Sequence, residues 1–136
     1  MTIFTADDPA NTEAMPKIVV KVEKVTRLAD IMPAIRKITG LGISEAKQRI
    51  ESWRPIVEFL LYYNDHDEIA RRLRELMTAI PQLGARLRLF ELDEREEFEA
   101  LPNATAYEIS SDVLKNILLL HERELERWQN TDEDEL

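Results

Sequence analysis

The chain has 136 residues, of which 44% are hydrophobic and 33% charged, and its formal net charge is −9 at pH 7. This size predicts one domain with appendages. No apolar run approaches the roughly 20 residues that span a bilayer, residues 1–16 lack the apolar stretch of a signal peptide, and cysteine is absent. Disulfides and cysteine-based sites are therefore excluded. We expect a cytoplasmic, bacterial-type protein with no membrane and no direct nucleic-acid partner.

The acidic charge is concentrated near the end of the chain. Residues 91–136 hold 15 acidic and 4 basic residues, a net charge of −11, whereas residues 1–90 hold 12 acidic and 14 basic residues, a net charge of +2. The acidic segment should attract either the rest of the chain or a basic partner. A solvated face that only keeps the protein in solution is the alternative interpretation.

The first predicted elements are a strand and two helices. Residues 1–16 are interpreted as a flexible tail, and alternating apolar residues predict a half-buried strand over residues 17–25. Apolar residues at helical spacing then predict one helix from Leu28 onward and a second one after Gly42. The second helix has four residues on its apolar stripe: Ile43, Ala46, Ile50 and Trp53.

A very short turn separates these two helices. Gly40 suits a left-handed helix C-cap, and Gly42 allows the chain to enter the next helix at once. The sequence therefore predicts a tight helix–turn–helix hairpin.

Three further elements complete a predicted sandwich. A second strand is predicted over residues 57–63, a helix follows from Asp65 to about Ile80, and a third strand covers residues 85–92. Asp65 and Glu68 have capping-box spacing at the start of that helix. The order β-α-α-β-α-β predicts an α/β (α+β) fold, a two-layer sandwich with three helices on one face of a three-stranded antiparallel sheet.

Residues 93–130 form an acidic helical extension, and residues 131–136 are predicted to be a disordered acidic tail. A short helix is expected over residues 93–101. A longer one begins after Ser110 or Ser111 as N-cap and runs to about Gln129. A helix this apolar is not left in water, so it either covers the second face of the sheet or pairs with a second copy or a partner. The sheet residues that it would cover are Leu60, Tyr62 and Phe90.

The residue types needed for catalysis are sparse. His66 and His121 are far apart in the sequence, and two histidines without cysteine make a poor metal site. Gly40 and Gly42 lie between two helices and lack the surroundings of a phosphate-binding loop, and the serines lack a nucleophile-elbow context. We therefore expect a non-enzymatic protein with no cofactor and no metal.

The hairpin resembles the C-terminal domain of the bacterial ribosomal large-subunit stalk protein. Residues 36–42, Arg-Lys-Ile-Thr-Gly-Leu-Gly, match the end of that family's first helix and its turn, and residues 43–47, Ile-Ser-Glu-Ala-Lys, match the start of its second helix. The resemblance covers about residues 17–92. It implies the same fold as the periodicity does.

The resemblance also implies a partner-binding surface. The stalk domain recruits translational GTPases through its first two helices. The residues of this chain that correspond to that patch, or substitute for it, are Arg27, Ala29, Ile31, Met32, Arg36, Leu41 and Lys47. This chain departs from the family at Leu28 and Pro33, where lysines are expected, and at Asp30, which adds a negative charge to the patch.

Two functions follow as hypotheses. The favoured one is a small acidic immunity or inhibitor protein that neutralises a basic protein toxin by direct binding, with Glu122, Glu124 and Glu126 in the contact. The alternative is a translation-associated accessory that binds a translational GTPase or the ribosome through the hairpin. In either case the chain is expected to be a monomer, or a homodimer formed through its C-terminal helix.

Overall fold

The computed structural model describes residues 15–23, 25–61 and 65–135, with side chains described as far as Arg127. Residues 1–14 of the predicted tail and Tyr62 lie outside the described residues. The elements in chain order are β2 (Pro16–Glu23), α2 (Leu28–Thr39), α3 (Ile43–Glu51), β3 (Val57–Leu60), α4 (His66–Gln82), β4 (Arg86–Asp93), the 3-10 turns η1 (Phe98–Ala100) and η2 (Ala104–Tyr107), β5 (Glu108–Ile109) and α5 (Ser111–Glu135).

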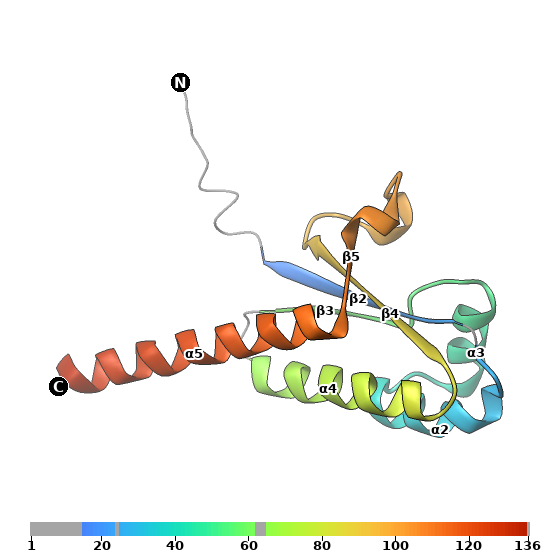
Figure 1. The fold of residues 1–136 in the computed structure, drawn as a ribbon, viewed down its shortest axis with the longest axis horizontal. Helices are drawn as coiled ribbons and strands as arrows, with labels where there is room; N and C mark the ends of the chain where they lie inside the picture. Colours follow the sequence, from blue (N-terminus) through green and yellow to red (C-terminus); the bar gives the residue numbers. More distant parts are fainter. Residues whose placement is uncertain (1–14, 24, 62–64, 136) are drawn as a thin grey trace.

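The mixed α/β class is confirmed, but the prediction of three strands is wrong. The sheet has four antiparallel strands in the order β3-β2-β4-β5 (Figure 1). The added strand β5 pairs Ile109 with Leu89 and Glu108 with Phe90. A strand of two residues is too short to show an alternating pattern, so periodicity does not predict it.

The main core lies between one face of the sheet and the helices. Ile18 and Val20 of β2 meet Ile31 and Ile35 of α2, and Leu73 of α4 packs in the same cluster. The predicted β-α-α-β-α-β order is therefore present. The prediction that the C-terminal helix covers the second face of the sheet is wrong.

The second face of the sheet is covered by residues 98–107 and not by α5. Val19, Phe90 and Leu92 form a small buried cluster there, and partly buried residues of the η1–η2 segment pack on it. The ring of Phe98 meets the ring of Phe90 edge to face, with 4.8 Å between centroids. Residues 93–101, predicted as an acidic helix, instead contain the last residue of β4 and the 3-10 turn η1, whose Phe98 packs on this face.

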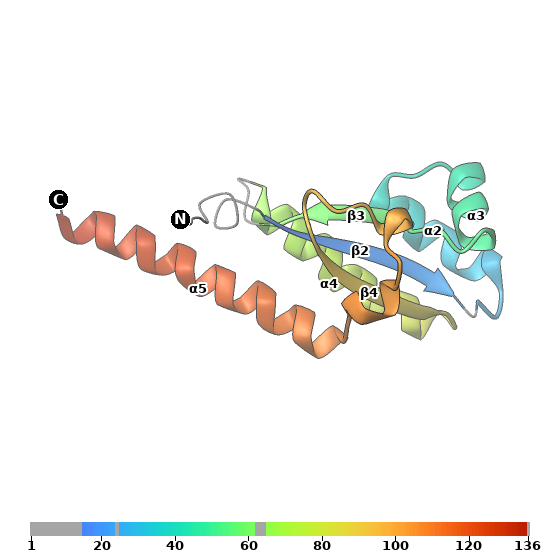
Figure 2. The same cartoon turned by 90° about the horizontal axis from the view of Figure 1, so that it is seen from above.

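The long helix α5 packs beside α4 through its first half. Leu114 and Leu118 are fully buried in the main core cluster, and the second half of the helix runs past the rest of the molecule (Figures 1 and 2). Ser110 is the predicted N-cap, since its hydroxyl accepts a hydrogen bond from the Val113 N–H at 3.1 Å. The helix continues to Glu135, so it includes residues 131–135, which were expected to be disordered.

Candidate functional site

The predicted partner-binding residues fall into two separate groups, with α3 and the far end of α5 at opposite ends of the molecule (Figure 1). One group belongs to the α2–α3 hairpin, and the other, Glu122, Glu124 and Glu126, belongs to α5. In the hairpin group, Ile31 has no exposed surface and Met32 is buried, because both lie on the stripe of α2 that faces the sheet. They are core residues and cannot contact a partner directly.

The remaining predicted residues of α2 lie on its exposed side. Ala29, Pro33 and Arg36 are exposed and are spaced four and three residues apart, which places them on one helix face. Arg27 is exposed and forms an ion pair with Asp30 at 3.7 Å. Arg36 and the residues beside it therefore form a continuous exposed stripe that ends at the turn.

The turn has the predicted left-handed cap. Gly40 has φ of 80°, and its N–H donates a hydrogen bond to the carbonyl oxygen of Arg36 at 2.9 Å. The Thr39 hydroxyl accepts a hydrogen bond from the Leu41 N–H at 3.2 Å, and Leu41 is half-buried against the main core. The turn thus fixes the angle between α2 and α3.

On α3, apolar and basic side chains lie together in solvent. Ile43 is 53% exposed although its spacing predicted a core residue. Lys47 follows one turn later and lines a shallow depression of about 360 Å³. The other residues around this depression are Ser44, Gln48, Glu51 and Ser52.

Trp53 is the feature that the sequence pattern misplaced. The helical spacing predicted it on the apolar stripe of α3, but the helix ends at Glu51 and Trp53 is 60% exposed. Its φ of 61° lies in the left-handed region. The Arg54 N–H donates to the Arg49 carbonyl oxygen at 2.8 Å and the Trp53 N–H to that of Ile50 at 3.3 Å. This is the hydrogen-bond pattern of a Schellman cap, in which Trp53 occupies the position that usually holds glycine.

The hairpin also carries basic groups that form no ion pair with the described residues. Arg36, Lys37 and Lys47 form no ion pair with any residue that the structure describes. Four of the 15 acidic residues of residues 91–136, by contrast, form ion pairs with arginines in the part of the chain that the structure describes. The pairs are Asp93–Arg95, Glu99–Arg54, Glu108–Arg88 and Glu122–Arg74. The hydrogen bonds from Arg88 hold the pKa of Glu108 below its usual range. Internal pairing therefore lowers the charge that this segment offers to a partner.

A groove of about 720 Å³ lies between α2, α4 and α5, outside the main core. Lys37, Arg71 and Arg74 line it together with Asp67, Glu75 and Glu122. Opposite charges are mixed along its walls, so it favours neither an anion nor a cation. Across the described part of the chain, no group of three or more histidine, aspartate or glutamate side chains is placed to hold a metal ion.

The comparisons with known proteins give no relative. No protein-family model matches the chain, and neither the curated proteins nor the solved structures include a significant match. Among the described helices, none combines the length and the apolar character that crossing a membrane requires. The likeness to the stalk domain therefore rests on the hairpin motif alone.

Proposed function

We propose that this protein is a non-enzymatic binding module that docks on an acidic surface of a protein partner through its α2–α3 hairpin. The partner class that the resemblance implies is a translational GTPase or a ribosomal protein. The observation that carries this proposal is Trp53, a large exposed aromatic residue held in a left-handed conformation just after the end of α3, the helix that carries the exposed Ile43 and Lys47.

Trp53 fits a binding role for two physical reasons. Tryptophan and arginine are the residue types that most often dominate the energy of protein interfaces. In addition, a bulky residue at positive φ is strained, and strain of this kind is found preferentially at functional sites. Glycine would relieve it at this position. Trp53 lowers stability through its strained backbone and is mostly exposed to water. A partner that covers its ring would explain why a tryptophan is present here.

The basic residues of the hairpin would favour partners with an acidic surface. Arg36 and Lys47 are exposed and have no described partner, so they provide a positive potential around the apolar side chains. Acidic residues on the partner would pair with them, while Ile43 at the start of α3 and Trp53 after its end each make an apolar contact. The expected interface is therefore apolar at its centre and basic at its rim.

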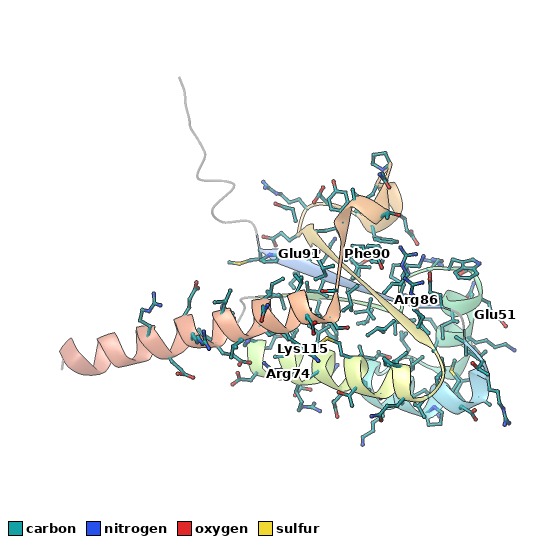
Figure 3. All side chains as sticks on the ribbon, viewed as in Figure 1. Glu51, Arg74, Arg86, Phe90, Glu91 and Lys115 are labelled. Carbon is teal, nitrogen blue, oxygen red and sulfur yellow. The ribbon has the colours of Figure 1, made fainter. Side chains whose placement is uncertain are left out.

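Direct binding to a purified elongation or initiation GTPase tests this proposal. The variants are Trp53→Ala and the double variant Arg36→Ala/Lys47→Ala, measured by fluorescence anisotropy with a dye on the GTPase. The matched control is Lys115→Ala/Arg123→Ala, which removes two exposed bases from α5, away from the hairpin; Figure 3 labels Lys115 on α5 and Glu51 on α3. Loss of binding in the hairpin variants alone supports the proposal, whereas equal loss in the control contradicts it.

A second candidate function is inhibition of a basic protein toxin through the projecting half of α5. Glu124 and Glu126 are exposed there, and four of the last five residues of the chain are acidic. This candidate predicts binding that weakens in high salt. A chain ending at Arg127 that also carries Glu124→Gln and Glu126→Gln keeps Leu114, Leu118 and His121 and removes these acidic groups. If that chain binds the toxin as tightly as the full chain does, the acidic end has no such role.

A further inference from the structure

Two histidines that the hairpin does not use lie against each other inside the molecule. His66, the first residue of α4, is only 2% exposed, and His121 of α5 is 8% exposed. Their ring centroids are 4.3 Å apart and the rings meet edge to face at 73°. We call these two residues the histidine pair.

Histidine is an unusual residue type for a buried contact between two helices, here α4 and α5. Neither ring nitrogen of His66 has a hydrogen-bond partner among the described residues. A buried polar group without a partner opposes folding, and such groups are rare in native structures. An apolar ring of the same shape would avoid this cost, so packing alone does not account for a histidine here.

The histidine pair lies in the contact between α4 and α5. His121 lies three residues after Leu118 and seven after Leu114, so all three are on the stripe of α5 that faces the core. His66 meets this stripe from α4. The histidine pair therefore forms the outer end of the α4–α5 contact, beyond which α5 leaves the body (Figures 1 and 2).

The charged groups around the histidine pair come from both helices. Oε2 of Glu122 on α5 is 3.7 Å from Nε2 of His66, and Arg74 on α4 binds the same carboxylate oxygen at 2.9 Å. Burial, together with the nearby His66, lowers the pKa of His121, while Glu124 and Glu122 act in the opposite direction. The effect of burial is the larger one, so this contact favours the neutral form of the His121 ring.

We propose that the histidine pair is an acid-sensitive contact that holds α5 against α4 while the buried His121 ring is neutral and releases the first half of α5 when that ring is protonated. The His121 ring lies 4.3 Å from the ring of His66, and a positive charge on it loses its hydration inside the interface. Release exposes Leu114 and Leu118 while the sheet stays folded.

The sign of the pH dependence follows from the lowered pKa of His121. A histidine that is more easily protonated in the released state stabilises the docked state fully above its ordinary pKa of about 6.5. The stabilisation is lost as the pH falls below that value. For one histidine that stays neutral when docked, the docking equilibrium weakens about tenfold between pH 7.5 and pH 5.5.

Hydrogen exchange followed by mass spectrometry tests the proposal on the full chain. We compare the peptide covering residues 113–122 with peptides of β2 and β4 at pH 7.5 and pH 5.5, after correction for the intrinsic exchange rate. The expected result is about tenfold faster exchange of the α5 peptide at pH 5.5, with the strands unchanged. An α5 peptide equally protected at both pH values overturns the proposal.

The variant His121→Phe separates this role from simple packing. Phenylalanine keeps the ring but cannot be protonated, so the α5 peptide should be protected at least as well as in the native chain at pH 7.5 and should lose its acid response. His66→Phe is the control variant, because it keeps the buried His121 and should therefore retain an acid response. If His121→Phe retains the full acid response of the native chain, the histidine pair is not the sensor and the proposal is wrong.

Discussion

The left-handed conformation of Trp53 leads to a prediction about the order of two substitutions. Trp53→Ala and Trp53→Gly both remove the indole ring, so its contacts cancel when the two variants are compared. A residue with a Cβ atom pays about 1–2 kcal/mol in the left-handed conformation, whereas glycine costs about 0.5–1 kcal/mol in backbone entropy. Trp53→Gly should therefore be more stable than Trp53→Ala by about 0.5–1 kcal/mol.

Urea denaturation followed by far-UV circular dichroism measures this difference. With a slope of about 1–3 kcal/mol/M for a protein of this size, the two midpoints should differ by a few tenths of a molar. Gln48 is the control, because it is exposed inside α3. There Gln48→Ala should be more stable than Gln48→Gly by about 1 kcal/mol. The same order at both positions, with alanine more stable, would refute the assignment of a left-handed cap at Trp53.

Two other predictions concern the contacts that hold the added elements. Leu118→Ala should destabilise the chain by about 2–5 kcal/mol because the side chain is fully buried, whereas the exposed Leu120→Ala should stay within about 0.5 kcal/mol; equal midpoints in urea would mean that α5 is not docked. Arg88→Ala should cost about 2 kcal/mol at pH 7, because Arg88 binds Glu108 through two hydrogen bonds at 3.0 and 2.6 Å. Since the pKa of Glu108 is lowered in the folded chain, this stabilisation is present above the ordinary carboxyl pKa of about 4.3 and is lost as the pH falls through the folded value. The gap between Arg88→Ala and the native chain should therefore narrow from pH 6 to pH 3, while the exposed neighbour Arg86→Ala should show little gap at any pH.

The sequence predicted the elements of residues 17–92 well because their periodic patterns of apolar residues extend over many positions. Ile18, Val20 and Val22 repeat every second residue and are all buried, and Ile31 and Ile35 repeat at helical spacing on α2. Periodicity shows that a stripe is buried but does not show against what. For that reason the apolar stripe of α5 was identified, yet its place beside α4 was not.

The candidate site was harder to predict because burial and binding compete for the same side chains. Ile31 has the helical spacing that predicts the first helix and was also assigned to the binding patch, and the structure places it in the core. Trp53 was assigned to the core because it continued the spacing of α3. The helix ends two residues earlier, and one left-handed residue is enough to turn its side chain off the stripe. The spacing of apolar residues does not reveal that a residue other than glycine occupies such a cap.

The cover on the second face of the sheet explains why α5 is free to act separately. Tyr107 donates a hydrogen bond to Oε2 of Glu96 at 3.1 Å, and the Lys17 ammonium donates to the backbone oxygen of Glu96. These bonds fasten residues 96–107 over Phe90 without any contribution from α5. If α5 had been needed to close that face, its release would expose the sheet and unfold the domain. Because α5 takes no part in that cover, opening at the histidine pair would uncover its buried residues in the main core, Leu114 and Leu118, and leave the second face of the sheet closed. A reversible acid response requires this condition.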